Sequence, residues 1–338
     1  MIRADANTRM GTGHLMRCLA LAQAWQVQGG EAVFVTACDS EGLLQRIRGE
    51  RFQVVELQKT YPDPDKWDAT SRVLAAYPEA WVVLDGYHFD PAYQRRVKKT
   101  DHPLLVIDDM AHLDHYYADV VLNQNIHALQ LEYSCEPYTR LLLGTDYVLL
   151  RREFWPWREW EREIPDVARK VLVTLGGGDP DNQTLKVIRA LQQVNVDGLE
   201  VTVVVGASNP HFEELEFAVR HSLFDIRLVR NVSDMPELMA WADVAVTAGG
   251  STCWEIAFLG LPNILLVLAD NQKGIAEKLG KTSVVRNLGW YEGVTSKQMA
   301  ETLSNLISDR KQRQQMSANG QKLVDCKGGK RVTLSLLT

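Results

Sequence analysis

Short runs of β-branched and other apolar residues alternate with amphipathic stretches along the whole chain. This alternation is typical of parallel α/β units, in which helices join buried strands. In the first half the apolar runs predict strands at residues 2–4, 31–36, 53–57, 80–85, 103–107 and 119–122. In the second half they predict strands at residues 170–175, 201–205, 226–229, 243–247, 263–268 and 283–285. The pattern therefore predicts an α/β fold built on parallel sheets.

The clearest helix is predicted over residues 13–28. Its apolar positions recur at helical spacing and share one face: Leu15, Cys18, Leu19, Ala22 and Trp25. Two further helices are predicted near the end of the chain, at residues 296–308 and 310–322, each polar and charged on one side.

The length of the chain predicts two domains. With 338 residues it exceeds what one compact core usually holds. We place an N-terminal domain at residues 1–150, a linker at 151–168 and a C-terminal domain at 169–338. The linker holds three tryptophans and two prolines among many charges. These tryptophans either form a platform for a sugar or hold the two domains together.

Composition and charge exclude several classes of protein. An apolar fraction of 46% and a charged fraction of 24% are typical of a soluble globular protein. A net charge of −6, with no block of Lys and Arg, argues against a nucleic-acid partner. Five scattered cysteines without a C-x-x-C motif predict a reducing compartment. No apolar stretch approaches the roughly 18 residues of a membrane span, and no signal peptide is evident. We therefore expect a cytoplasmic protein.

A glycine-rich turn opens the first predicted long helix. Residues 11–17 read GTGHLMR, and such glycines let a backbone approach a ligand while the helix N-terminus favours an anion. A dinucleotide fingerprint would need a third glycine where Met16 stands, and no phosphate-loop motif occurs in the chain. His14 at the start of this helix suits a base or a water-orienting group, or else it simply caps the helix.

Acidic residues follow two neighbouring apolar strands. Asp85 ends one strand and the pair Asp108 and Asp109 ends the next. Because open α/β sheets bind ligands at the carboxyl ends of their strands, these residues are candidates for a site, or else they cap the segments that follow. Nearby, His112 and His115 suggest zinc, but nothing completes a set of four ligands. We expect neither a metal nor a cofactor.

Two more glycine turns follow strands in the second half. Residues 175–179 read LGGGD, and residues 247–252 read TAGGST. Backbone amides, together with the hydroxyls of Ser251 and Thr252, can hold a diphosphate. Glu255, one turn into the next helix, can reach the hydroxyls of a ribose or can be an ordinary solvated glutamate. Asn271 and Gln272 end another strand, where their amides can meet sugar hydroxyls or cap a helix.

Taken in order, these pieces resemble a known family across nearly the whole chain. Its most specific motifs are residues 3–5 (RAD) with residues 11–17, and residues 147–154 (YVLLRREF). Residues 122–125 (LNQN), the glycine turn with Asp179, and the Asn271-Gln272 pair add to them. The chain resembles the UDP-2,4-diacetamido-2,4,6-trideoxy-β-L-altropyranose hydrolases of pseudaminic acid biosynthesis. Spore-coat polysaccharide proteins of the same sequence type belong with them.

This resemblance implies a fold and a reaction. The family is similar to GT-B glycosyltransferases, so it implies two Rossmann-like domains with a cleft between them, UDP being held mainly by the second. The implied reaction is metal-independent attack of water at the anomeric carbon of a UDP-sugar, which releases UDP and the free hexose with inversion. We expect a monomer or weak oligomer whose partner is that UDP-sugar.

The resemblance also implies roles for individual residues. His14 positions or deprotonates the water, and Tyr87 lies beside the reacting sugar. The implied substrate-binding residues are Asp5, Gly13, Arg17, Gly177, Gly250, Ser251, Thr252, Glu255, Asn271 and Gln272. Of these, Glu255 takes the ribose and the 250–252 turn takes the diphosphate. Family members often have Asp-His-Tyr where this chain has Asp-Gly-Tyr at 85–87, and we carry no role to His88, which follows the tyrosine.

Three alternative functions stay open at this stage. A GT-B glycosyltransferase would transfer the sugar to an alcohol, and the only sequence argument against it is that no membrane-docking patch is evident in the first domain. A UDP-sugar epimerase would rely on more acidic catalytic residues. A sugar-nucleotide-binding protein without activity would bind UDP and turn nothing over.

Overall fold

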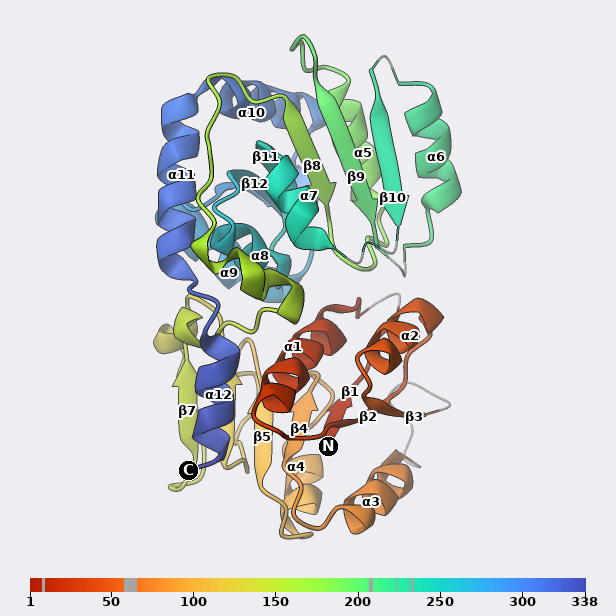
Figure 1. The fold of residues 1–338 in the computed structure, drawn as a ribbon, viewed down its shortest axis with the longest axis vertical. Helices are drawn as coiled ribbons and strands as arrows, with labels where there is room; N and C mark the ends of the chain where they lie inside the picture. Colours follow the sequence, from red (N-terminus) through yellow and green to blue (C-terminus); the bar gives the residue numbers. More distant parts are fainter. Residues whose placement is uncertain (8–9, 58–65, 207–208, 223, 231, 233) are drawn as a thin grey trace. The chain divides into compact units, whose positions relative to one another are not determined.

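The computed structural model describes residues 1–7, 10–57, 66–206, 209–222, 224–230, 232 and 234–338. The chain divides into two compact units (Figure 1). Unit 1 comprises Met1–Arg152 and Lys327–Thr338, and unit 2 comprises Glu153–Cys326. Each unit is built on its own sheet.

Unit 1 contains a seven-stranded parallel sheet in the order β3-β2-β1-β4-β5-β6-β7. Its strands are β1 (Ile2–Ala4), β2 (Val33–Thr36), β3 (Gln53–Glu56), β4 (Val82–Asp85), β5 (Leu104–Ile107), β6 (Val120–Asn123) and β7 (Arg140–Leu143). Its helices are α1 (Gly13–Val27), α2 (Glu41–Gly49), α3 (Lys66–Ala76), α4 (Pro91–Lys98) and α12 (Gly328–Leu336), with short 3-10 helices η1 (Ala128–Gln130) and η2 (Thr145–Tyr147). Apolar side chains pack on both faces of the sheet: Phe34 and Leu105 in one cluster, and Val35 and Leu104 in the other.

Unit 2 repeats this plan with six parallel strands in the order β10-β9-β8-β11-β12-β13. Its strands are β8 (Lys170–Thr174), β9 (Glu200–Val205), β10 (Ile226–Arg230), β11 (Val244–Ala248), β12 (Asn263–Val267) and β13 (Arg286–Trp290). Its helices are α5 (Gln183–Leu191), α6 (Phe212–Arg220), α7 (Met235–Trp241), α8 (Thr252–Phe258), α9 (Lys273–Lys281), α10 (Ser296–Ser308) and α11 (Arg310–Leu323). Shorter 3-10 helices are η4 (Asp270–Gln272) and η5 (Tyr291–Gly293), while η3 (Arg152–Glu159) begins at the last residue of the first segment of unit 1.

Strand order reverses at one position in each sheet. In unit 1 the chain moves outward from β1 through β2 to β3, then returns to pair β4 with the other side of β1. In unit 2 the corresponding pair is β8 and β11. Open α/β sheets bind ligands at the carboxyl ends of strands at such a reversal. Both glycine turns that follow β8 and β11, and the turn that follows β1, therefore stand at the favoured position.

The predicted α/β class with two Rossmann-like sheets is confirmed, and most predicted strands lie within one or two residues of the observed ones. The strand predicted at 283–285 is displaced, because β13 covers Arg286–Trp290. Strand β7 was not predicted. Its four residues include the exposed Arg140 and Leu141, so it lacks the continuous buried run of strands such as β4, β5 and β6.

The final helix of the chain belongs to unit 1, although the predicted C-terminal domain included it. In Figure 1 α12 lies beside α1, and the two helices pack against each other. Val332 of α12 is fully buried in the same core as Leu15 and Leu19 of α1. This helix was missed because it begins with two glycines, which are poor helix formers. Close approach explains the first of them: a Cβ on Gly328 would lie 2.2 Å from the carbonyl oxygen of Val148.

Substituting Gly328 tests this docking. Gly328→Ala should lower the free energy of unfolding by about 1–3 kcal/mol, because the added methyl group meets backbone atoms that cannot rotate away. Urea unfolding followed by circular dichroism measures the change. Gly49→Ala, at a position where a Cβ would meet nothing within 4 Å, is the matched control and should be neutral or stabilising. Equal stability of both variants would contradict close packing at Gly328.

Candidate active site

The side chain of His14 is oriented by a buried carboxylate at the strand reversal of unit 1. His14 lies in the first turn of α1, directly after the β1 loop, and Asp85 is the last residue of β4. The two side chains meet at 2.6 Å between Nδ1 and Oδ1, and Asp85 is 0% exposed. Because an ionised carboxylate only accepts hydrogen bonds, we assign the proton to Nδ1, which leaves Nε2 as the acceptor.

Arg17 lies one turn further along α1 and bridges two carboxylates. Its guanidinium binds Asp85 twice, with Nε and Nη2 each 2.7 Å from a carboxylate oxygen. Its Nη1 lies 2.7 Å from Oδ1 of Asp109, which follows β5. Planar guanidinium groups suit such two-point binding, so Arg17 fixes the spacing between the ends of β4 and β5.

Asp109 in turn holds two further side chains. Tyr87 donates its hydroxyl to Oδ2 at 2.7 Å, and Asn125 donates its amide to Oδ1 at 2.8 Å. The ring of Tyr87 meets the ring of His14 edge-on, with centroids 5.2 Å apart. The structure therefore brings the two expected catalytic residues, His14 and Tyr87, into contact above one buried network.

Charges within this network set the ionisation of its members. Burial alone would raise the pKa of Asp85, but the charge of Arg17 and the hydrogen bonds from Arg17 and His14 outweigh it and hold that pKa below its usual range. The pKa of Asp109 is also low, since Arg17 and the hydroxyl of Tyr87 outweigh the effect of burial. Both carboxylates raise the pKa of Arg17 further. The cluster therefore contains two carboxylates and one permanent cation.

The Nε2 nitrogen of His14 can take part in a reaction. The His14 side chain is 9% exposed, and its recorded hydrogen bonds within the described residues all involve Nδ1. Arg17 Nη2 lies 3.3 Å from that nitrogen, but the 2.6 Å contact with Asp85 is the shorter of the two. Because Asp85 holds Nδ1, the ring can accept a proton at Nε2. Asp85 then offsets the positive charge that the ring gains.

Asp5 and Arg17, both expected to bind substrate, are instead committed to internal contacts. Asp5 is 0% exposed, and its carboxylate binds Arg3, the backbone amide of Ala37 at 2.7 Å and His88 at 3.2 Å. Arg3 and these hydrogen bonds keep the pKa of Asp5 low in spite of burial. The expectation of direct binding does not fit this arrangement. Both residues support the site through contacts inside unit 1. His88, to which no role was assigned, contributes to this support through its contact with Asp5.

The first glycine turn of unit 2 leads into α5. Asp179 accepts hydrogen bonds from the backbone amides of Gln183 and Thr184, at 2.7 and 2.8 Å, so it stabilises the start of that helix. Burial raises the pKa of Asp179 although these hydrogen bonds lower it. The backbone of Gly177 packs closely against Gly206, because a Cβ added to Gly206 would come within 2.4 Å of the carbonyl oxygen of Gly177. Asp179 therefore serves the fold of the turn.

The second glycine turn of unit 2 joins β11 to α8. A Cβ on Gly249 would lie 2.8 Å from Gln272, whereas one on Gly250 would meet nothing within 4 Å. Gln272 accepts hydrogen bonds at Oε1 from the amides of Gly249 and Leu268, at 3.2 and 2.9 Å. Gln272 therefore stabilises the turn with the side-chain amide that was expected to meet sugar hydroxyls. Gly250 is the glycine that leaves room for a ligand.

The remaining expected residues of unit 2 surround this turn. Ser251 directly precedes α8, Thr252 begins it, and Glu255 lies in its first turn. Ser251 makes no capping hydrogen bond with its side chain. Asn271 lies in η4, next to the bracing Gln272. Gly13, expected in the first domain, is the first residue of α1, adjacent to His14.

Among the described residues, no group of three or more His, Cys, Asp and Glu side chains could hold a metal ion. The two histidines considered for zinc have other partners. His112 Nδ1 lies 2.8 Å from Asp108, and His115 Nδ1 lies 2.9 Å from the hydroxyl of Ser134. These contacts use the nitrogens in hydrogen bonds within the protein.

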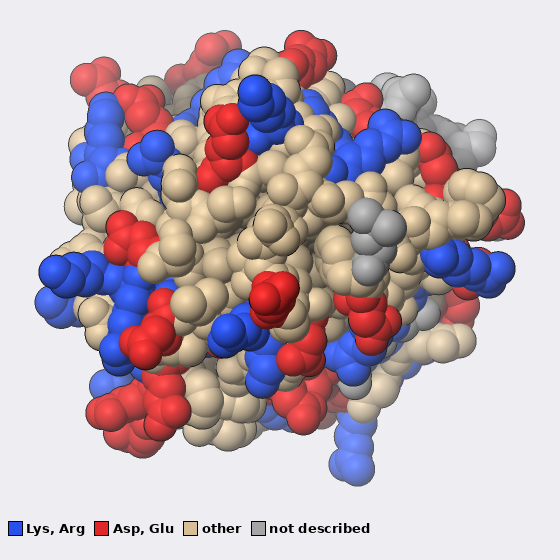
Figure 2. Space-filling view, turned by 90° about the horizontal axis from the view of Figure 1, so that it is seen from above, with Lys and Arg blue, Asp and Glu red and all other residues tan. Residues whose placement is uncertain are grey.

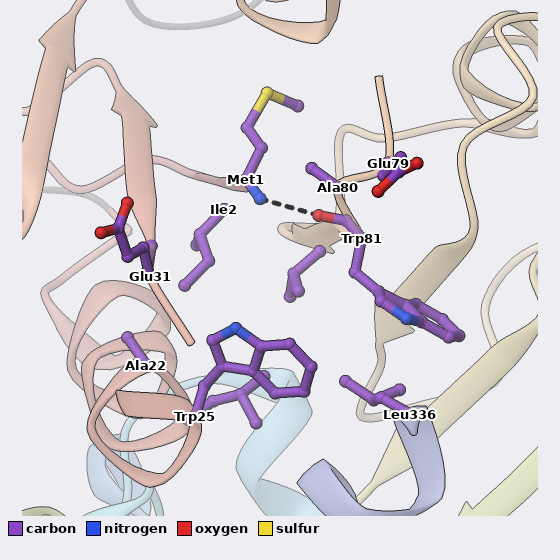
Figure 3. Close-up of a pocket in the computed structure, with 12 residues that line it drawn as sticks. Met1, Ile2, Ala22, Trp25, Glu31, Glu79, Ala80, Trp81 and Leu336 are labelled. Atoms are coloured by element: carbon purple, nitrogen blue, oxygen red, sulfur yellow. Dashed lines mark hydrogen bonds between the residues drawn. The ribbon is translucent and has the colours of Figure 1, made fainter. Parts of the chain in front are cut away.

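A pocket of about 130 Å³ lies at the opposite ends of the same strands (Figure 3). Met1, Trp25 and Trp81 line it, and the terminal amine donates to the carbonyl oxygen of Trp81 at 2.7 Å. Burial lowers the pKa of that amine to about 6. Since β1 and β4 begin here and end near His14, the pocket is separate from the cluster around Arg17.

The surface offers no large area of a single charge on the face shown in Figure 2, where acidic and basic side chains are interspersed. This fits the modest net charge of −6. In the part of the chain that the structure covers, no helix has the length and hydrophobicity needed to cross a membrane.

Comparison with known proteins agrees with this architecture. Residues 171–328 match the glycosyltransferase family 28 C-terminal domain. Over its whole length the chain is similar to MurG of Acinetobacter baumannii, with a TM-score of 0.68 at 15% identity, covering 99% of this chain and 98% of that one. The chain has the GT-B fold. The match to the family 28 domain lies almost entirely within unit 2.

The names of two relatives concern polysaccharides and sugars. The spore coat polysaccharide biosynthesis protein SpsG of Bacillus subtilis (strain 168) is 26% identical over 99% of this chain and 96% of its own length. The second comes from Helicobacter pylori (strain ATCC 700392 / 26695) and is named pseudaminic acid cytidylyltransferase and UDP-2,4-diacetamido-2,4,6-trideoxy-beta-L-altropyranose hydrolase. It is 23% identical over 69% of this chain and 41% of its own length.

Sequence reasoning missed several residues of the GT-B protein's network. Asn125 was noticed only as part of a motif, and His112 only as a possible zinc ligand. Polar residues at the ends of buried strands, such as Asn123, Gln124 and Asn125 at the end of β6, were the available signal. The pairing of Asp85 with His14 could not be read from the chain, because 71 residues separate them.

The buried carboxylates predict how the GT-B protein responds to acid. Asp5, Asp85 and Asp109 all have lowered pKa values in the folded state, so the unfolded chain binds more protons at low pH. Their stabilisation is present above about pH 5 and is lost as the pH falls below the ordinary aspartate value of about 3.9. Asp109→Asn should cost about 3 kcal/mol at pH 7 and much less at pH 3.

Urea unfolding across this pH range measures both effects. The exposed Asp101 is the matched control, and Asp101→Asn should leave the curve unchanged. A cost of Asp109→Asn that stays constant from pH 7 to pH 3 would contradict an ionised, partnered carboxylate.

Proposed function

We propose that the protein hydrolyses a UDP-linked diacetamido-trideoxyhexose to the free sugar and UDP, in nonulosonic acid (pseudaminic-type) or surface polysaccharide biosynthesis. The observation that carries this proposal is the contact between His14 Nδ1 and the buried Asp85, which fixes the imidazole with Nε2 as its proton acceptor. Such an arrangement supplies a general base for water.

The proposed reaction uses His14 to activate the attacking water. As the water oxygen forms a bond to the anomeric carbon, Nε2 accepts its proton. The bond between the anomeric carbon and the diphosphate oxygen breaks, and its electron pair leaves with UDP. Attack from the side opposite to the leaving group inverts the anomeric centre. Tyr87 contacts His14 and donates to Asp109, and in this proposal it would lie beside the reacting sugar.

Unit 2 supplies the nucleotide contacts in this proposal. The backbone amides at Gly250 and the hydroxyls of Ser251 and Thr252 would take the diphosphate, and Glu255 would take the ribose. Space at Gly250 supports the first assignment, since a ligand can approach its backbone. A diphosphate held by such donors leaves without a strong acid, so the chemistry needs one well-placed base. Asn271 would contact the sugar or its phosphate.

The relatives support this substrate class at a general level. The Helicobacter pylori protein carries a UDP-sugar hydrolase in its name, and the Bacillus subtilis protein belongs by name to spore-coat polysaccharide synthesis. Both are similar to this chain at less than 30% identity.

A glycosyltransferase is the second candidate, favoured by the family 28 domain in unit 2. The same His14 and Asp85 pair would then deprotonate an alcohol in place of water. Incubation with UDP-sugars and no acceptor separates the two functions: rapid formation of free hexose supports hydrolysis, and its absence supports transfer or binding alone. In ¹⁸O-labelled water, a hydrolase of this type places the label on the sugar and leaves UDP unlabelled.

Replacing the base tests the proposed mechanism. His14→Ala should reduce turnover by about 10²–10⁴-fold, because the water loses its proton acceptor. UDP affinity should stay nearly unchanged, since the nucleotide contacts are proposed in unit 2. UDP release from a panel of UDP-linked diacetamido-trideoxyhexoses, with EDTA present, measures turnover, and calorimetry measures affinity.

A histidine of unit 2 provides the control for that experiment. His221, in the exposed turn after α6, bonds to the carbonyl oxygen of Phe217, and His221→Ala should behave like the wild type. Near-full turnover by His14→Ala would remove His14 from its proposed role.

Replacing the ribose ligand tests the nucleotide site. Glu255→Ala should weaken UDP binding about 10-fold or more, because hydrogen bonds to charged groups contribute about 1.5–3 kcal/mol. The comparison is Glu277→Ala, an exposed glutamate of α9 that pairs with Lys281. Calorimetric titration with UDP is the measurement, and equal affinities for both variants would refute the assignment of Glu255.

A further inference from the structure

The buried carboxylate of Asp85 has a partner besides His14 and Arg17. Cys18 of α1 places Sγ 3.4 Å from Oδ2 of Asp85, a distance at which a thiol donates a hydrogen bond. Oδ2 also accepts from Arg17 Nε, and Oδ1 accepts from His14 Nδ1 and Arg17 Nη2. An ionised carboxylate has about four acceptor sites. Cys18 therefore supplies the fourth hydrogen bond to a carboxylate that water does not reach.

The thiol of Cys18 keeps its proton, so it is able to donate. Burial raises the pKa of this thiol well above its ordinary value, and the negative charge of Asp85 adds to the effect, although Arg17 opposes it. A thiolate would bring a second negative charge against Asp85, whereas the S–H group gives that carboxylate a donor. The contact is consequently a hydrogen bond from sulfur to a carboxylate.

Cys18 lies at the border between the apolar core and the polar network of unit 1. It comes four residues after His14 and directly after Arg17, so the three side chains share one side of α1. Cys18 is fully buried and packs in the same core as Leu15 and Leu19. A cysteine behaves as a small apolar residue with a weak donor, which suits a position with apolar neighbours on one side and an acceptor on the other.

Contacts at both oxygens decide how the Asp85 carboxylate is turned. Oδ1 faces His14, and rotation of the carboxylate about its bond to Cβ would carry Oδ1 away from the imidazole. The same rotation would separate Oδ2 from Cys18 and from Arg17 Nε. Because Oδ1 holds the proton on Nδ1 of His14, the contacts of Oδ2 bear indirectly on Nε2, the nitrogen that accepts the proton in the proposed reaction.

We propose that Cys18 is a positioning residue: its thiol holds Oδ2 of Asp85, so that Oδ1 stays turned toward His14. The expected effect on turnover rests on the proposed function, whereas the hydrogen bond is a property of the free protein. Cys18 acts through Asp85 and His14 and takes no part in the bonds that form and break.

Two substitutions of similar size separate the hydrogen bond from packing. Serine and alanine are both smaller than cysteine, but only serine keeps a donor. Cys18→Ala should lower kcat for UDP-sugar hydrolysis about 10-fold and leave UDP affinity unchanged, because a carboxylate that can turn misplaces the base. Cys18→Ser should stay within about threefold of the wild type, since a hydroxyl also donates to Oδ2. UDP release gives kcat, and calorimetry gives UDP affinity. Equal kcat for the two variants would overturn the positioning role.

Cys326 provides the matched control. It is a buried cysteine of unit 2. Cys326→Ala and Cys326→Ser should both turn over UDP-sugar at the rate of the wild type. If alanine at Cys326 lowered kcat as much as alanine at Cys18, with serine restoring it, the effect could not be assigned to the contact with Asp85.

Nuclear magnetic resonance tests the same contact without substrate. The Nδ1 proton of His14 lies between atoms 2.6 Å apart, so it should give a resonance far downfield, identified by its loss in His14→Ala. Cys18→Ser should keep this resonance, whereas Cys18→Ala should shift it or broaden it through exchange with water. An unchanged resonance in Cys18→Ala would contradict the proposal, as would its absence from the wild type.

The two measurements separate the possible failures. If the wild type turns over no UDP-sugar while the resonance depends on Cys18, the proposed function fails and the hydrogen bond stands. If turnover is clear but Cys18→Ala and Cys18→Ser agree in rate and resonance, the positioning role fails and the hydrolase stands.

Discussion

The guanidinium of Arg17 lies between the carboxylates of Asp85 and Asp109, and the positions of the reactive side chains follow from these contacts. Two buried carboxylates at the ends of neighbouring strands repel each other and lose their hydration, a combination that folding tolerates only with a cation between them. Once Arg17 supplies that cation, each carboxylate can still accept a hydrogen bond from another partner. Oδ1 of Asp85 accepts from His14 as well as from Arg17, and Oδ2 of Asp109 accepts from Tyr87. Lysine could not replace Arg17, because a single ammonium lacks the planar fork that binds both carboxylates at fixed spacing.

The parallel sheet explains why this network stands where it does. Strands β4 and β5 are neighbours, so their last residues and the loops after them meet at one edge. Helix α1 starts at the same edge because it follows β1, the other neighbour of β4. A spacing of three residues then places His14 and Arg17 on one face of that helix, where both reach Asp85. Fold and site are therefore linked by topology: the strand reversal brings together residues that are far apart along the chain.

Because the site depends on strand order, the sequence alone predicts only part of it. Apolar runs predicted both parallel sheets, and the glycine turn marked His14, because these signals are local. The partners of His14 and Arg17 were visible as acidic strand ends, but which acid meets which base depends on strand order, which the chain does not state. For the same reason Asp5 and Arg17 were expected to bind substrate, whereas burial turned both toward internal partners. The last helix was assigned to the wrong unit because its packing on α1 depends on residues more than 300 positions away.

The two units share one plan of parallel strands but carry different groups at the ends of those strands. In unit 1 the strand ends carry charged side chains that bind one another, which suits the handling of a proton because each charge has a fixed compensating partner. In unit 2 the corresponding turns are built from glycines, and the polar residues beside them, such as Asp179 and Gln272, are used to hold the backbone. A backbone held open in this way presents amide groups and suits an anionic ligand. In the proposed reaction, proton transfer would use the pre-arranged charges of unit 1, and phosphate binding would use the exposed amides of unit 2.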